Sequence, residues 1–83
     1  MSVIDTVKTV LGQTLQISEK AKRFDTTTGL FGSIAEFDSM AVVAVVAALE
    51  ERFGIVIEDE EINGDTFQTV GSLSEFIERK LHA

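Results

Sequence analysis

The chain has 83 residues, of which 45% are hydrophobic and 25% charged, a composition that suits one small globular domain and excludes a wholly disordered chain. It contains no Cys and a single His, His82 beside the C-terminal residue, which excludes disulfides and nearly excludes Cys/His metal clusters and Ser-His-Asp catalysis. The net charge is −7, and the excess lies in residues 36–65, where nine acidic residues accompany one base, Arg52.

Apolar residues at helical spacing predict a first helix over residues 3–17. Ser2 followed by Asp5 is typical of a capping box at its start, while Gly12 weakens the pattern slightly. Residues 18–37 then form a connection that is long for a compact domain. Because this connection carries several apolar side chains, we expect it to pack on the core; they are Leu30, Phe31, Ile34 and Phe37.

A second helix is predicted over residues 39–53, with Asp38 as its N-cap and Gly54 just beyond its C-terminus. Its β-branched valines favour a strand, but fifteen residues without a turn signal exceed an ordinary strand. The predicted buried face consists of Val42, Val45, Val46, Leu49 and Phe53. The predicted exposed apolar face consists of Met40, Val43, Ala44 and Ala47.

Residues 55–57 are apolar but solitary, so we expect an extended segment that packs in the core rather than a sheet. A short helical turn is expected within residues 59–64, and a last helix from Thr69, its N-cap, to about Leu81. Its predicted buried stripe consists of Val70, Leu73, Phe76, Ile77 and Leu81. The sequence therefore predicts an all-α fold, a small bundle of three or four helices, as a single domain over residues 1–83.

Four consecutive carboxylates occupy residues 58–61, and their mutual repulsion predicts raised pKa values. Part of the same segment imitates a calcium loop, with acidic or amide side chains at Asp59, Glu61 and Asn63. The twelfth position of such a loop should be a bidentate Glu, and it is Val70 here, so we expect no metal site.

The motif Asp-Ser-Met occupies residues 38–40 at the start of the second predicted helix. Together with residues 48–55 and 69–73, which lie at matching spacing, it resembles the acyl carrier proteins, whose signature at this helix start is Asp-Ser-Leu. The resemblance covers nearly the whole chain and implies their helical bundle with a long first loop. The chain departs from the family pattern at Ala41 and Ala44, where acidic residues are usual, and this favours an apolar docking face over charge-led docking.

The resemblance implies that Ser39 carries a 4′-phosphopantetheine from coenzyme A, and that Asp38 caps the helix and contributes to transferase recognition. First-turn N–H groups and the helix dipole favour a phosphate on the Ser39 oxygen, although Ser39 could instead only help to cap the helix. The thiol of the arm would hold an acyl group as a thioester, so the chain would be a carrier and not an enzyme. Residues 31–34 and 38–43 are also similar to specialised carriers associated with bacterial exosortase and exopolysaccharide systems.

The implied partners are a phosphopantetheinyl transferase, an acyl-loading ligase or synthase, and acyl-transfer enzymes. We expect them to dock on a surface that is apolar near Ser39 and acidic further along, formed by Met40, Val43, Ala44, Ala47, Glu50 and Glu51. A pocket for the acyl group is expected among Val43, Val46, Ala47, Ile57, Ile62 and Phe67.

The acidic stretch repels nucleic-acid phosphates, so we expect no nucleic-acid partner. The longest apolar run has ten residues, at 40–49, about half of a membrane span, and the first residues lack the pattern of a signal peptide. We therefore expect a cytoplasmic monomer that does not insert into a membrane. Three alternatives to an acyl carrier remain open: an aminoacyl or peptidyl carrier, a cofactor-free helical interaction module, and a calcium-responsive helical protein.

Overall fold

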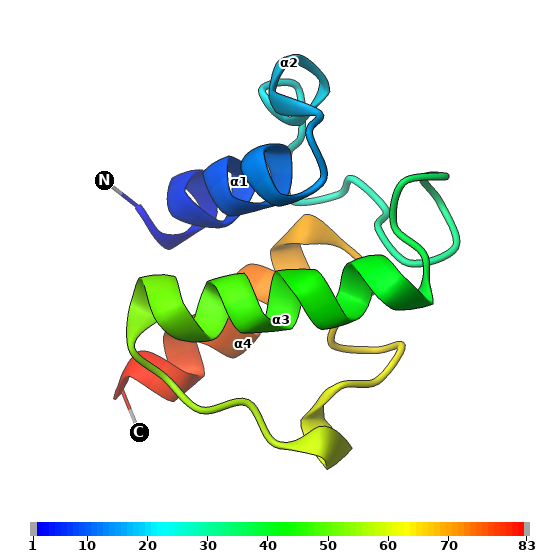
Figure 1. Ribbon diagram of the computed structural model, residues 1–83. Coiled ribbons are helices and arrows are strands. Elements are labelled where there is room, and N and C mark those ends of the chain that lie inside the picture. Colours follow the sequence, from blue (N-terminus) through cyan, green and yellow to red (C-terminus); the bar gives the residue numbers. More distant parts are fainter. Residues whose placement is uncertain (1, 83) are drawn as a thin grey trace.

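The computed structural model describes residues 2–82, and its elements are all helical (Figure 1). They are α1 (Val3–Thr14), α2 (Ser18–Ala21), α3 (Ser39–Phe53), the 3-10 turn η1 (Asp59–Glu61) and α4 (Val70–His82). Within residues 2–82, β-type pairing is limited to one isolated bridge between Gly29 and Thr69. The predicted all-α bundle is confirmed, and no helix in this part of the chain is long and apolar enough to cross a membrane.

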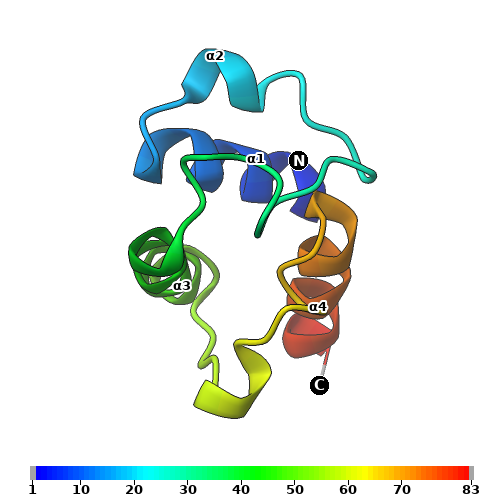
Figure 2. The ribbon, with the colours of Figure 1, turned by 90° about the vertical axis from the view of Figure 1, so that its right-hand side faces the viewer.

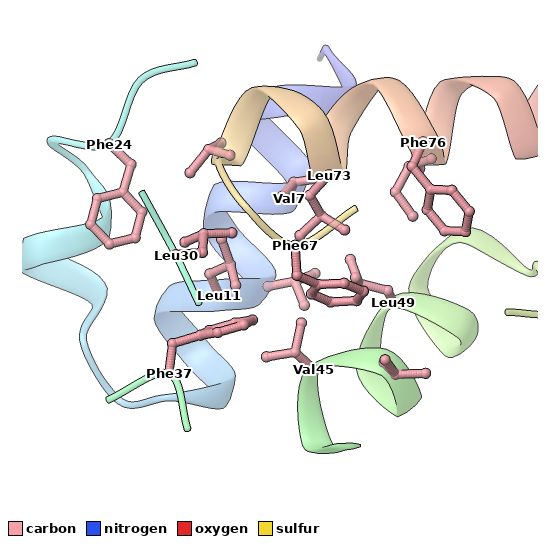
Figure 3. Close-up of a cluster of buried hydrophobic side chains, with 14 of the residues drawn as sticks. Val7, Leu11, Phe24, Leu30, Phe37, Val45, Leu49, Phe67, Leu73 and Phe76 are labelled. Atoms are coloured by element: carbon pink, nitrogen blue, oxygen red, sulfur yellow. The ribbon is translucent and has the colours of Figure 1, made fainter. Parts of the chain in front are cut away.

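Helix α1 lies at the centre of the packing and contacts α2, α3 and α4. Viewed along α3, α1 crosses above α3 and α4, α2 lies on its outer side, and η1 lies at the opposite end of the molecule (Figure 2). The space enclosed by α1, α3 and α4 is filled by apolar side chains from all three helices and from the loops (Figure 3). Those labelled there are Val7, Leu11, Phe24, Leu30, Phe37, Val45, Leu49, Phe67, Leu73 and Phe76.

The first helix ends at Thr14, so its predicted extension to residue 17 is wrong. Gln16 adopts a left-handed conformation (φ 58°), and the Ile17 N–H turns back to donate to the Gly12 carbonyl at 2.8 Å. A Cβ on Gly12 would lie 3.0 Å from Ser18 Cα, so this glycine allows α2 to approach α1 closely. At the other end, the hydroxyl of Ser2 accepts the Asp5 N–H, which confirms the N-cap.

The long connection packs on the core as predicted, since Leu30 and Phe37 are buried, but Phe31 is 48% exposed. Its backbone is joined to the segment that leads into α4. The Leu30 N–H donates to the Gln68 carbonyl at 2.8 Å, and the Gly71 N–H donates to the Thr26 carbonyl at 3.0 Å. These bonds fix the loop that precedes α3, although no local pattern in the sequence indicates them.

Helix α3 begins and ends at the predicted residues. Asp38 Oδ1 accepts the Ala41 N–H at 2.9 Å, and Gly54 ends the helix in the left-handed conformation (φ 67°). Its buried residues are Ala41, Val45, Val46 and Leu49, whereas Val42 and Phe53 are only half-buried.

Beyond α3, Ile57 is the one buried residue of the predicted core segment, and Val56 is 67% exposed. The predicted turn is confirmed as η1. The Thr69 hydroxyl caps α4 by accepting the Ser72 N–H at 3.0 Å. Leu81 is 41% exposed and does not belong to the buried stripe, because it lies in the last turn of α4, beyond the packed part of the helix.

Candidate functional site

Ser39 is the first residue of α3 and is exposed to solvent. The first bonds of this helix are made by the Ala41 N–H to the Asp38 side chain and by the Val42 N–H to the Asp38 carbonyl at 3.0 Å. The N–H groups of Ser39 and Met40 therefore have no acceptor within the helix. They provide unpaired donors at the positive end of a helix of fifteen residues, directly beside the Ser39 hydroxyl.

This arrangement fits a phosphodiester on Ser39. The hydroxyl is accessible to a second enzyme, the neighbouring N–H groups can donate to phosphate oxygens, and the helix dipole favours the negative charge. Because the carboxylate of Asp38 is already held by the Ala41 N–H, it stabilises the helix start without depending on the Ser39 hydroxyl.

The segment that leads to Ser39 is fixed on both of its sides. Phe37 is buried in the core, and its ring lies 6.0 Å from that of Phe67. Glu36 forms an ion pair with Lys20 of α2 at 3.0 Å, and this hydrogen-bonded ammonium holds the pKa of Glu36 below its ordinary value. Asp38 and Ser39 are thus placed by contacts to both the core and α2.

The apolar residues predicted for docking form one exposed strip along α3. Met40 is 80% exposed and Val43 is 69% exposed, and Ala44 and Ala47 are also exposed. Glu51 continues the strip at the far end of the helix, because it follows Ala47 by four residues.

Glu50 differs from the other residues predicted for docking. It is half-buried, and its Oε2 accepts the Ile57 N–H at 2.8 Å. The carboxylate therefore ties the segment after α3 back to the helix. No local sequence signal links residues seven positions apart in this way, so the sequence suggested an exposed acidic residue instead.

The six residues predicted for an acyl pocket do not surround one cavity. Val43 and Ala47 are exposed to solvent, whereas Val46 and Ile57 are buried in the core. A pocket of about 110 Å³ beside α3 is lined by Phe31, Val42, Ile62, Asn63, Gly64 and Phe67. Ile62 and Phe67 are common to both sets. The sequence could have indicated Val42 as a lining residue, because it follows Ser39 by three residues on the same helix. Phe31 lines the pocket from the loop before α3, and no periodic pattern in the sequence indicates that contact.

The acidic segment is less repulsive than expected. Glu61 Oε1 lies 2.6 Å from the Lys80 ammonium and accepts the Glu58 N–H at 2.9 Å. The hydrogen bond from Lys80, supported by that of the Glu58 N–H, lowers the pKa of Glu61. The predicted rise in pKa is therefore wrong for Glu61, because α4 supplies a base to this cluster.

Comparisons with known proteins agree with this geometry. The family model described as a phosphopantetheine attachment site matches residues 4–77. An acyl carrier protein of Sulfurovum sp. (strain NBC37-1) is 36% identical over 78 residues, covering 94% of this chain and 97% of that protein. An acyl carrier protein of Wolinella succinogenes is 35% identical over 79 residues, covering 94% of this chain and 96% of that protein.

A solved structure extends the similarity to the whole fold. The solution NMR structure of a holo acyl carrier protein from Nitrosomonas europaea is 42% identical, covers 100% of both chains and superposes with a TM-score of 0.92. The chain belongs to the acyl carrier proteins, a family of generally non-catalytic helical carriers that bear an acyl group on a covalently attached 4′-phosphopantetheine and generally interact with synthases and transferases.

Proposed function

We propose that Ser39 is the residue that bears the phosphopantetheine, and that residues 1–83 act as one carrier unit. The observation that carries this proposal is the exposed Ser39 hydroxyl at the first residue of α3, directly after the capping Asp38. The chain provides an attachment point and a contact surface, and separate enzymes carry out the chemistry.

Attachment requires a phosphopantetheinyl transferase and coenzyme A. The Ser39 oxygen forms a bond to the phosphorus that bears the pantetheine arm, and the pyrophosphate bond of coenzyme A breaks. Adenosine 3′,5′-bisphosphate leaves, and the hydroxyl proton passes to a base of the transferase. The N–H groups of Ser39 and Met40 then lie beside the new phosphodiester.

The free thiol of the arm receives the acyl group as a thioester from a ligase or synthase, and an acyl-transfer enzyme later removes it. We assign partner docking to the exposed strip on α3, with Met40 and Val43 nearest to Ser39 and Glu51 at the far end. Such partners would present an apolar surface near the arm, bordered by basic residues that meet Glu51. Since each partner approaches a single α3, the carrier can act as a monomer.

The attachment is tested by intact mass after incubation with coenzyme A and a transferase of broad specificity. The wild-type chain should gain one phosphopantetheine, and Ser39→Ala should gain none. Ser18→Ala is a matched control, because Ser18 is also an exposed serine at the first residue of a helix. The Ser18→Ala variant should gain one phosphopantetheine like the wild type. Normal modification of Ser39→Ala would refute Ser39 as the attachment site.

A further inference from the structure

Met40 presents its thioether to solvent directly beside the proposed attachment residue. It is the second residue of α3, at the end of the helix where the chain enters from the loop (Figure 1), and it is 80% exposed. No other large apolar residue among residues 2–82 is as exposed: Val43 reaches 69%, and Leu81 in the last turn of α4 reaches 41%. The packing of the core therefore does not depend on Met40, and a change confined to its side chain should leave the fold intact.

Met40 is also the one sulfur that the described residues offer to an oxidant. The chain has no Cys and two Met, and the other, Met1, lies outside residues 2–82. Hydrogen peroxide converts a thioether to a sulfoxide: the sulfur bonds to one peroxide oxygen, the O–O bond breaks, and the other oxygen leaves as water. The sulfur is oxidised by two electrons, and the peroxide is reduced. The product replaces a flexible apolar side chain by a polar one.

A polar group at this position opposes the way in which the exposed strip on α3 binds a partner. Residues 39–49 carry no charge, so the contact nearest to Ser39 depends on apolar burial, for which methionine is a favoured side chain. Because Met40 follows Ser39 directly, a transferase that reaches the Ser39 hydroxyl covers Met40 as well. A sulfoxide oxygen buried there against an apolar surface loses its hydrogen bonds to water and gains none. The N-cap bond from the Ala41 N–H to Asp38 does not involve the Met40 side chain, so the helix start is retained.

We propose that Met40 is a reversible oxidation site, and that its sulfoxide weakens docking of the phosphopantetheinyl transferase on α3. The oxidant is hydrogen peroxide. A methionine sulfoxide reductase reverses the step: the sulfoxide oxygen leaves as water, the sulfur regains two electrons, and two thiols of the reductant form a disulfide. The carrier is then loaded at its full rate only while Met40 is reduced. This inference rests on the proposed attachment at Ser39 and on the proposed docking along the exposed strip on α3.

The test uses the full chain before the arm is attached, because its lack of Cys leaves methionine as the side chain that peroxide oxidises most readily. After brief treatment the peroxide is removed, peptide mass mapping confirms one added oxygen on Met40, and transferase loading from coenzyme A is measured. The KM for the oxidised carrier should rise by roughly 5- to 150-fold, the cost of burying an unpaired polar group, with kcat nearly unchanged. Tm should stay at the untreated value, and methionine sulfoxide reductases that act on both epimers should restore KM.

Met40→Leu is the matched control, because it keeps an apolar side chain without sulfur and still contains Met1. Peroxide should leave the KM of this variant unchanged. Met40→Gln should raise KM without peroxide, whereas Leu81→Gln, the same change at an exposed apolar residue of α4, should not. An unchanged KM after oxidation of Met40, or an equal rise in peroxide-treated Met40→Leu, would overturn the inference. Failure of the untreated chain to gain any phosphopantetheine would instead contradict the attachment at Ser39, and this inference with it.

Discussion

The carboxylate of Asp38 has two effects that substitutions can separate: Oδ1 caps α3 through the Ala41 N–H, and its charge lies next to Ser39. Asp38→Ala removes the cap and should lower the free energy of unfolding by about 1 kcal/mol, whereas Asp38→Asn keeps an acceptor and should change it little. If the transferase recognises the charge, both variants should be loaded more slowly than the wild type. Urea denaturation and loading rates measure the two effects, and wild-type loading of Asp38→Asn would argue against charge recognition.

The adjacent residues Glu50 and Glu51 should respond differently to the same substitution. Glu50→Ala leaves the part-buried Ile57 N–H without its charged acceptor, which should cost about 1.5–3 kcal/mol of unfolding free energy. Glu51 is exposed, and Glu51→Ala should stay within about 0.5 kcal/mol of the wild type. Chemical denaturation of both variants measures this difference. Equal losses would mean that Glu50 does not hold the segment after α3.

Among the elements, the junction between the first loop and α4 depends on one close backbone approach. A Cβ on Gly71 would lie 2.6 Å from the Thr26 carbonyl oxygen, which also accepts the Gly71 N–H. Gly71→Ala must therefore move the loop away from α4 and should destabilise the fold by about 1–3 kcal/mol. Gly64→Ala is the control, because a Cβ there meets open space and the substitution should be neutral or slightly stabilising. Thermal or urea unfolding distinguishes the two, and an unaffected Gly71→Ala would refute the close approach.

The ends of the helices differ in how far neighbouring residues in the sequence predict them. Helix α3 could be predicted to the residue, because Asp38 and Gly54 mark its ends in the sequence. The end of α1 could not, because Gln16 is not a residue that indicates a left-handed turn, and Ile17 continues the apolar period across it. For the same reason the position of Ser39 at a helix start could be predicted from the sequence, whereas the pocket beside α3 depends on contacts between distant segments.

At the scale of the whole molecule, the acidic stretch is interrupted by specific partners. Lys20 of α2 pairs with Glu36, Lys80 of α4 pairs with Glu61, and the backbone of Ile57 holds Glu50. Lys20 and Lys80 lie outside the acidic stretch of residues 36–65, so a count of charges within that stretch overestimates the repulsion. The net charge of the chain nevertheless remains −7, and a negative net charge favours the approach of a positively charged surface over a negatively charged one.

These pairings determine how the stability of the molecule should depend on pH. Asp25, Glu36 and Glu61 all have a pKa below the ordinary values of 3.8 for Asp and 4.5 for Glu. The causes are hydrogen bonds, chiefly from the Thr27 hydroxyl to Asp25, from Lys20 to Glu36 and from Lys80 to Glu61. A carboxylate whose pKa is lower in the folded state binds fewer protons there than in the unfolded state. Its stabilisation is therefore complete above the ordinary pKa and is lost as the pH falls through the folded value.

The Tm of the wild type should consequently decline as the pH falls below about 4.5, rather than rise as carboxylate crowding would require. Lys80→Met removes the ionic partner of Glu61 but keeps an unbranched side chain beside Phe76, over whose ring the ammonium lies at 5.7 Å. It should lower Tm at neutral pH and reduce the loss of Tm on acidification. Arg79→Met is the control, because Arg79 is an exposed neighbouring base without an ion pair among residues 2–82, and it should keep the wild-type pH profile. Thermal unfolding of the three proteins across the acid range measures both effects. If Lys80→Met and the wild type lose Tm equally on acidification, the Glu61 pair does not contribute to acid unfolding.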